Sequence, residues 1–153
     1  MNRILVINGP NLNLLGKRRV KIYGRKSYND LCDYIDAYCL RNYGNHTKHS
    51  HVSIEYFQSN SEGEIINKLH ASESRFDAVV LNAAAYTHYS YAIRDAIESI
   101  EIPVAEVHLT DLDERENFRK SSVIRSVCAF NVQGHGFLSY SKAIDKLIKI
   151  LNP

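Results

Sequence analysis

The chain has 153 residues, of which 44% are hydrophobic and 24% charged, and its formal net charge is only +2. This composition is that of an ordinary soluble globular protein, and the length suits a single domain over residues 1–153. The small net charge argues against a surface built to bind nucleic acid. No apolar run approaches the ~18 residues that a membrane span needs, and polar Asn8 comes too early for a signal peptide. We therefore expect a cytoplasmic protein without a membrane anchor.

The cysteines and clustered histidines give weak signals for metal or disulfide chemistry. Three cysteines, an odd number, include no C-x-x-C pair, which argues against both a disulfide framework and a zinc site. Their positions are Cys32, Cys39 and Cys128. The pattern His46-x-x-His49-x-His51 has a spacing that metal ligands use, but it lies in a polar stretch without cysteine or carboxylate support. We expect reduced thiols and no metal site.

Short apolar runs alternate with segments of helical periodicity along the whole chain. The predicted strands are Arg3 to Ile7, Val52 to Phe57, Asp77 to Asn82, Val104 to His108, and Val127 to Val132. The predicted helices lie within Ser27 to Gly44, Ser61 to Leu69, His88 to Ile100, and Phe137 to Leu151. Alternating strands and helices imply parallel βαβ units with right-handed crossovers. The sequence therefore predicts an α/β fold, a flavodoxin-like doubly wound sheet of five parallel strands with helices on both faces.

The helix after Ser27 has the clearest local signals. Leu31 and Ile35 fall on one helical face. Ser27 is an N-cap candidate with Asp30 three residues later, as in a capping box, and Gly44 is a plausible C-terminal stop.

The segment from Asn8 to Asn13 is the most informative turn in the sequence. It follows a predicted buried strand and contains three asparagines around Gly9 and Pro10. Glycine permits a positive φ, and proline fixes its own φ, so the segment is typical of a turn. Uncharged amides suit a hydroxylated ligand or a held water, although an ordinary strand-to-helix turn explains the same residues.

Other polar residues also follow predicted strands. Asn82 ends the third strand with His88 beyond it, and His108 ends the fourth with Thr110 behind it. The carboxyl ends of parallel strands meet at the edge where open α/β sheets bind ligands. The sequence therefore predicts a small-molecule site at this edge.

A strongly basic segment embeds a tyrosine close to this predicted site. Residues Lys17 to Lys26 include six cations and no acid, between Gly16 and Gly24 as candidate hinges. A basic segment is usually a solvated face or a nucleic-acid patch. Cations beside a phenol favour the phenolate, so Tyr23 is a candidate general base in a loop that closes over substrate.

His108 is the best-placed histidine for acid chemistry. It follows Glu106 by two positions, so both side chains of the predicted strand point to the same face. A carboxylate in this position orients an imidazole. A buried histidine that only satisfies its hydrogen bonds is the alternative.

Several sequence blocks, in order through nearly the whole chain, match one pattern. They are Ile7 to Leu12, Leu15 to Arg18, Tyr23-Gly24, Gln58 to Glu64, Leu81 to Ala83, Tyr86 to His88, Ala92 to Ala96, Glu106 to Leu109, and Arg115 to Arg119. Together these blocks resemble the type II 3-dehydroquinate dehydratases. The resemblance implies a flavodoxin-like fold, no cofactor, and removal of water from 3-dehydroquinate to give 3-dehydroshikimate in the shikimate route to aromatic amino acids.

The resemblance also implies catalytic roles. Tyr23 is expected to take a C2 proton, with Arg18 favouring its phenolate form. Asn11 is expected to stabilise the enolate through a water, as an oxyanion hole does. His108 is expected to protonate the departing C1 hydroxyl while Asn82 and the orienting residue Glu106 hold it in place.

The binding residues follow from the same resemblance. His88 and Arg119 are expected to hold ring hydroxyls, and Leu109 and Thr110 to receive the substrate carboxylate. Asp95 is expected to reach a neighbouring subunit's site in a trimer, four of which form a dodecamer.

The chain departs from the family pattern at three places. Arg19-Val20 stands where Glu-Pro is common, Ala83-Ala84 where Pro-Gly or another small pair is common, and Thr110-Asp111 where Ser-Asn is common. Threonine keeps the hydroxyl, so we expect carboxylate binding to survive. The stretch from Asn45 to His51 and the extra charge at Arg19 bear on lid behaviour and assembly.

Two other function classes compete with this interpretation. A flavin- or phosphate-binding module on the same fold would need a phosphate loop rich in Ser, Thr and Gly after the first strand, where this chain has asparagines. An inactive relative that only binds ligands is the second alternative, and the retained Tyr23, Arg18 and His108 argue against it.

Overall fold

The computed structural model describes residues 1–44 and 51–153, so the predicted metal-ligand candidates His46 and His49 lie outside the described residues. Its centre is a sheet of five parallel strands in the order β2-β1-β3-β4-β5. The strands are β1 Asn2–Asn8, β2 Val52–Gln58, β3 Ala78–Asn82, β4 Val104–His108 and β5 Phe130–Gln133. The strand order reverses between β1 and β3. This topology confirms the predicted flavodoxin-like α/β fold.

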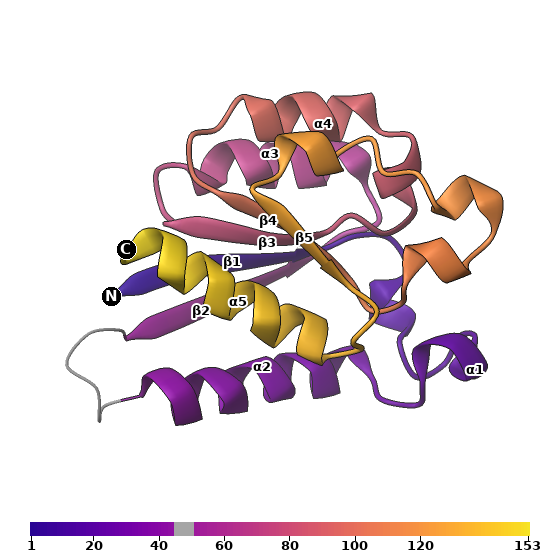
Figure 1. The fold of residues 1–153 in the computed structure, drawn as a ribbon, viewed down its shortest axis with the longest axis horizontal. Helices are drawn as coiled ribbons and strands as arrows, with labels where there is room; N and C mark the ends of the chain where they lie inside the picture. The colour runs from indigo at the N-terminus through magenta and orange to yellow at the C-terminus, as the bar shows by residue number, and fades with distance from the viewer. Residues whose placement is uncertain (45–50) are drawn as a thin grey trace.

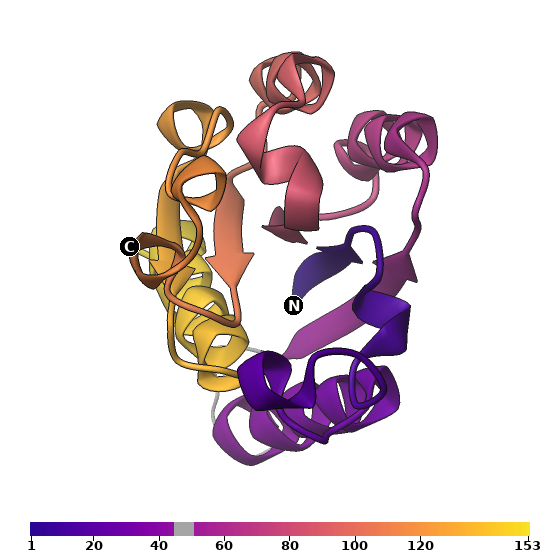
Figure 2. The same cartoon turned by 90° about the vertical axis from the view of Figure 1, so that its right-hand side faces the viewer.

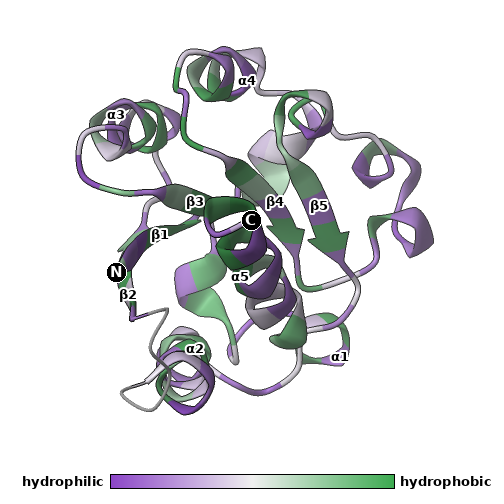
Figure 3. Ribbon diagram, turned by 60° about the vertical axis from the view of Figure 1, so that its left-hand side comes forward, coloured by the Kyte–Doolittle hydropathy of each residue, from purple (hydrophilic) through white to green (hydrophobic). Residues whose placement is uncertain are grey.

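Helices cover both faces of the sheet (Figure 1). The covering helices are α2 Tyr28–Tyr43, α3 Glu62–Ser72, α4 Tyr91–Glu98 and α5 Leu138–Leu151. The short helix α1 Val20–Tyr23 lies beyond the carboxyl edge of the sheet. Figure 1 shows α2 and α5 on one side and α3 and α4 on the other. Each face has its own apolar cluster, with Ile4 facing α2 and α5 and Leu5 facing α3 and α4. Strands that are buried on both faces consist of continuous runs of apolar residues. The sheet is therefore largely green, the colour of hydrophobic residues, in Figure 3.

The predicted ends of the α2 helix are confirmed. The Ser27 hydroxyl accepts a hydrogen bond from the Asp30 N–H at 3.1 Å, and the Asp30 carboxylate accepts one from the Ser27 N–H at 2.7 Å. Gly44 ends the helix with a φ of −74°, outside the left-handed region. A Cβ at Gly44 would lie 2.3 Å from the Leu40 carbonyl oxygen, so close packing explains the glycine.

Two predicted elements have different boundaries in the structure. The predicted helix from His88 to Ile100 is shorter in the structure, where α4 runs from Tyr91 to Glu98. It begins there because a 3-10 helix over Ala84–His88 comes before it and the Ser90 hydroxyl caps α4 by accepting from the Ile93 N–H at 3.0 Å. The predicted strand from Val127 to Val132 is shorter, since a 3-10 helix over Arg125–Val127 comes before β5. In both cases a short 3-10 helix takes up residues that the sequence pattern assigned to the start of the longer element.

The loops at the carboxyl edge pack tightly against one another, and Figure 2 looks onto this edge. The Gly9 N–H donates to the Asn82 carbonyl at 2.7 Å, and a Cβ at Gly9 would lie 2.7 Å from the Ala83 carbonyl oxygen. The expected positive φ is not at Gly9 but at Asn11, with 69°, and at Ala84, with 52°. Gly9 is therefore needed for the close approach of two backbones. Within residues 1–44 and 51–153, no helix has the length and apolar character to cross a membrane.

Candidate active site

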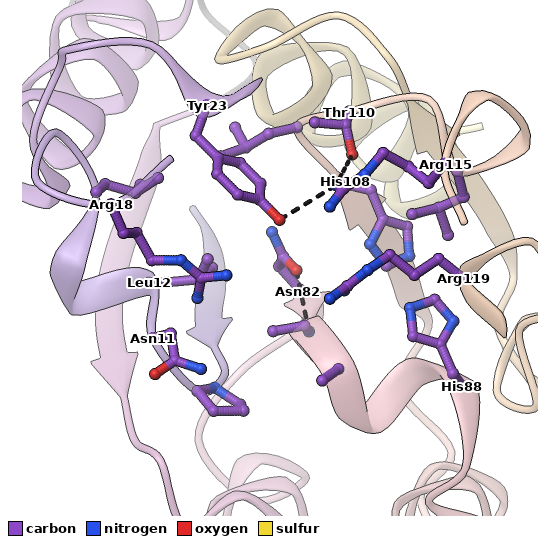
Figure 4. A pocket seen from close by; sticks show the side chains of 16 residues that line it. Asn11, Leu12, Arg18, Tyr23, Asn82, His88, His108, Thr110, Arg115 and Arg119 are labelled. Atoms are coloured by element: carbon purple, nitrogen blue, oxygen red, sulfur yellow. Dashed lines mark hydrogen bonds between the residues drawn. The ribbon is translucent and has the colours of Figure 1, made fainter. Parts of the chain in front are cut away.

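A pocket that opens to solvent lies at the carboxyl ends of β1, β3 and β4 (Figure 4). The predicted site residues that line it are Asn11, Arg18, Tyr23, Asn82, His88, His108, Leu109, Thr110 and Arg119. Glu106 lies behind His108 with a fully buried side chain. Asp95 is exposed on α4 and is absent from the pocket lining. The carboxyl edge therefore brings together nine of the eleven predicted site residues. Of the other two, Glu106 contacts His108 directly, whereas Asp95 lies elsewhere.

Two arginines approach Tyr23. The guanidinium carbon of Arg18 lies 5.2 Å from the centre of the tyrosine ring, and that of Arg115 lies 5.4 Å from it. Arg115 Nη1 donates to the Tyr23 hydroxyl at 3.1 Å and to the Thr110 hydroxyl at 3.1 Å. Both cations therefore lie beside the tyrosine, and the direct hydrogen bond to its hydroxyl comes from Arg115. Tyr23 stands on the short helix α1, whose flanking residues Arg19 and Gly24 both have positive φ, as does the candidate hinge Gly16 further upstream.

His108 and Glu106 form a buried pair on β4. Their side chains share a face, as the two-residue spacing predicts, and His108 Nε2 lies 2.7 Å from Glu106 Oε1. Burial opposes the charge of Glu106, but hydrogen bonds and positive charge from His108 and Arg125 outweigh it and hold the pKa of this carboxyl below its usual value. Glu106 is therefore ionised at neutral pH and suited to orient and stabilise an imidazolium.

Asn82 is held by partners other than His108. Its Nδ2 donates to the Tyr140 hydroxyl at 2.9 Å, and its Oδ1 accepts from the Ala84 N–H at 3.1 Å. The Tyr140 hydroxyl in turn donates to Asn8 Oδ1 at 2.6 Å. Among the described residues, the hydrogen bonds of the Asn82 side chain go to Tyr140 and Ala84 and not to His108. Asn8, which we expected beside a ligand, is fully buried beneath the site.

The turn after β1 presents a single asparagine to the pocket. Asn11 points toward the cavity in Figure 4, and its N–H donates to the side chain of Asn60 at 2.9 Å. Gln58 Nε2 donates to the Gly9 carbonyl at 3.3 Å and to Asn13 Oδ1 at 3.4 Å. Of the three asparagines in the predicted turn, Asn11 alone lines the pocket.

His88 and Arg119 form the opposite wall. His88 Nδ1 lies 2.7 Å from the Ser121 carbonyl oxygen, which accepts only, so Nδ1 carries the proton and Nε2 is an acceptor in the neutral ring. Burial lowers the pKa of His88 and so favours this neutral form. Arg119 Nε lies 3.1 Å from Glu116 Oε2. This wall offers an acceptor and a cation to a hydroxylated ligand.

Sequence reasoning missed three residues around the site. Arg115 belonged to a block of the resemblance but received no role, whereas Tyr140 and Arg125 carried no signal at all. Tyr140 lies in a helix pattern typical of core packing, and its contact with Asn82 depends on where α5 lies on the sheet. In the described part of the chain, no group of three or more His, Cys, Asp and Glu side chains could hold a metal ion.

Comparisons with known proteins show the family of the chain. The model of the family Dehydroquinase class II matches residues 2–148. The 3-dehydroquinate dehydratase of Caldicellulosiruptor bescii is 46% identical over 99% of this chain and 100% of its own length. That of Thermotoga neapolitana is 45% identical over 97% of this chain and 95% of its own. The crystal structure of the type II dehydroquinase from Butyrivibrio crossotus has a TM-score of 0.88 and 44% identity, covering 95% of this chain and 97% of that one. The chain therefore belongs to the class II dehydroquinase family.

Proposed function

We propose that this protein is a type II 3-dehydroquinate dehydratase, a hydro-lyase that eliminates water from 3-dehydroquinate to give 3-dehydroshikimate in the shikimate pathway. The observation that carries the proposal is one pocket lined by a tyrosine between two arginines and by a histidine paired with a buried carboxylate. This arrangement supplies a base and an acid to one small molecule. A flavin or phosphate site would need neither.

The first step is removal of a C2 proton by Tyr23. The substrate ketone acidifies this proton because the resulting negative charge spreads onto the carbonyl oxygen as an enolate. Tyr23 acts as the general base, and Arg18 and Arg115 place positive charge beside it. Asn11 stabilises the enolate oxygen through a water held at the turn after β1, in the manner of an oxyanion hole.

The second step is departure of the C1 hydroxyl. The enolate electrons re-form the ketone and create a carbon–carbon double bond, and the leaving hydroxyl accepts a proton from His108. Glu106 stabilises the protonated imidazole and fixes its orientation, at 2.7 Å from Nε2. The other ring nitrogen then delivers the proton. We propose that Tyr23 and His108 act on opposite faces of the ring, so that the elimination is trans, proceeds through an enolate and uses no cofactor.

The remaining pocket residues bind the substrate. The hydroxyl of Thr110 and the backbone at Leu109 receive the carboxylate, and His88 and Arg119 hold the ring hydroxyls. Arg115 Nη2 is buried and lacks a hydrogen-bond partner among the described residues, so it is a donor that a bound anion can satisfy. Arg115 then links the base and the carboxylate site.

We extend the proposal to the whole molecule. Residues 1–153 form one catalytic domain, which acts in the cytoplasm as a trimer and as a dodecamer of four trimers. Asp95, exposed on α4, completes the site of a neighbouring subunit. Its absence from its own chain's pocket supports this role.

The decisive experiment adds 3-dehydroquinate to the purified protein and follows the absorbance of the conjugated product. We expect absorbance to rise at a rate proportional to enzyme concentration. Isothermal titration under the same conditions distinguishes the alternatives. Heat of binding without product would indicate an inactive relative, and the absence of both would leave a different ligand.

A further inference from the structure

Glu106 has a second cationic partner besides His108. Arg125 Nε lies 3.2 Å from Glu106 Oε2, and Arg125 Nη2 lies 3.4 Å from Oε1. The Glu106 side chain is 0% exposed, and that of Arg125 is 34% exposed. Nη2 also donates to Gln133 Oε1 at 2.8 Å, and Gln133 Nε2 donates to Asp111 Oδ1 at 2.9 Å. The arginine is therefore anchored between the carboxylate on β4 and a side chain on β5.

We propose that Arg125 is a positioning residue for the general acid, because it keeps Glu106 ionised and in one orientation throughout the catalytic cycle. This inference rests on the proposed role of His108. Arg125 itself does not line the pocket and acts through Glu106.

The physical reason lies in the proton that His108 gives away. While His108 is protonated, its positive charge balances the buried carboxylate. Once the proton has left with the hydroxyl, a neutral imidazole can no longer do so, and an unpaired buried carboxylate is costly and tends to protonate. Arg125 is always charged, so its bidentate approach preserves the anion at that stage. The next protonation of His108 then occurs against an ionised and correctly oriented Glu106.

The other charged or titratable groups around this pair do not replace Arg125. His88 and Arg119 face His108 from the opposite wall, and burial keeps the pKa of His88 low. The Cys128 thiol lies near Glu106, but burial and that carboxylate raise its pKa to about 12, so it is neutral. Among the described residues, Arg125 and His108 are the cationic groups that hydrogen-bond Glu106.

The test compares the pH dependence of kcat in Arg125→Met, Arg125→Lys and Arg94→Met. Arg94 is the matched control because it holds the same segment, donating to the Val123 carbonyl at 2.8 Å and to the Ser126 hydroxyl at 2.7 Å, without contacting Glu106. Loss of the cation beside Glu106 raises the pKa of that carboxyl, so in Arg125→Met the acid-side loss of activity should begin about one pH unit higher. In the same variant we expect kcat at neutral pH to fall on the order of tenfold while KM changes little. Arg125→Lys, which keeps a positive charge, should recover part of the loss in kcat and part of the pH shift.

Each outcome has a defined meaning. An Arg125→Met enzyme with the wild-type kcat and pH profile would overturn the inference, as would the same pH shift in Arg94→Met, which would indicate loosening of the segment. Arg125→Gln provides the same test if the methionine variant does not fold. His108→Ala distinguishes failure of the proposed function from failure of the inference about Arg125. If His108→Ala retains kcat, the assignment of His108 as the acid is wrong. If it loses kcat while Arg125→Met behaves as wild type, only the role of Arg125 fails.

Discussion

Individual residues in this site adopt conformations that their side chains do not favour. Asn11 and Ala84 have positive φ, and both line the pocket. Asparagine tolerates the left-handed region, whereas for alanine it costs about 1–2 kcal/mol. The strain at Ala84 lies two residues after Asn82, whose Oδ1 accepts from the Ala84 N–H. The local backbone is thus shaped to hold the buried amide.

Ala84→Gly should relieve this strain. We expect the free energy of unfolding to rise by about 0.5–1 kcal/mol, the relief of the left-handed conformation less the greater flexibility of glycine in the unfolded chain. The matched control is Ala85→Gly, since Ala85 has no positive φ and should lose about 0.5–1 kcal/mol. Urea unfolding at one protein concentration measures both. A loss of stability in Ala84→Gly would contradict the prediction.

Tyr23→Phe should separate catalysis from binding. The hydroxyl is the proposed base, so we expect kcat to fall by at least the roughly 10²- to 10⁴-fold typical of acid–base residues, with substrate affinity changed by only a few fold. Steady-state assays and isothermal titration provide the two quantities. Tyr34→Phe is the control, because its hydroxyl bonds Ser141 between α2 and α5. Near-normal kcat in Tyr23→Phe would remove the residue from its role.

At the level of elements, tyrosine hydroxyls join α2 to α5. Tyr38 and Tyr43 on α2 both donate to the carboxylate of Asp145 on α5, at 2.7 and 2.5 Å. Both residues flank the cluster that also contains Tyr140. These contacts of Tyr38 and Tyr43 with Asp145, here called the seam, fix where α5 lies. Tyr140 on α5 supplies the hydroxyl that holds Asn82. The packing of two helices far along the chain is thereby linked to the site.

Because of the seam, we expect the free energy of unfolding to fall at alkaline pH. Burial and the hydrogen bond to Asp145 raise the pKa of Tyr38 from 10.0 to about 12 and also raise that of Tyr43. Between these values the unfolded chain releases protons that the folded chain retains, so the stabilisation present below pH 10 declines as the pH rises toward 12.

Unfolding by urea at several pH values measures this decline. Tyr38→Phe should show a shallower decline than wild type, because it removes a hydroxyl whose pKa is raised by folding. Equal slopes in wild type and Tyr38→Phe would show that the seam does not titrate as described.

At the level of the whole molecule, the proposed shared site involves the exposed side of α4. Asp95 lies on the exposed side of α4, and the neighbouring Tyr89 and Tyr91 are 59% and 66% exposed. Exposed aromatic side chains of this kind are enriched in protein interfaces. They support a subunit contact at which Asp95 reaches another pocket.

Mixing two inactive variants tests this contact directly. Tyr23→Phe lacks the base but supplies Asp95, and Asp95→Ala lacks the aspartate but keeps Tyr23. If both are dissociated and reassembled together at equal amounts, about one quarter of the sites should combine the intact halves in a closed ring. We expect about a quarter of wild-type activity. Light scattering confirms assembly, and each variant reassembled alone is the control. Full assembly without recovered activity would refute the shared site.

The sequence by itself determined most of the architecture and much of the site. Strands buried on both faces require continuous apolar runs, and Ser27 with Asp30 forms a cap from local geometry, so these features are visible without tertiary contacts. The period of two along a strand was enough to put Glu106 and His108 on one face. The family blocks added the remaining site residues, and nine of the predicted site residues line one pocket.

Only the tertiary structure decided which distant side chains meet. Arg115 contacts Tyr23 across 92 positions, and Tyr140 contacts Asn8 across 132. The partner of each hydroxyl depends on strand order, on helix placement and on turns such as the 3-10 helix at Arg125, none of which local periodicity encodes. Buried polar groups must find hydrogen bonds wherever the fold brings a donor or an acceptor, so the supports of Tyr23, Asn82 and Glu106 emerged only once the chain was folded.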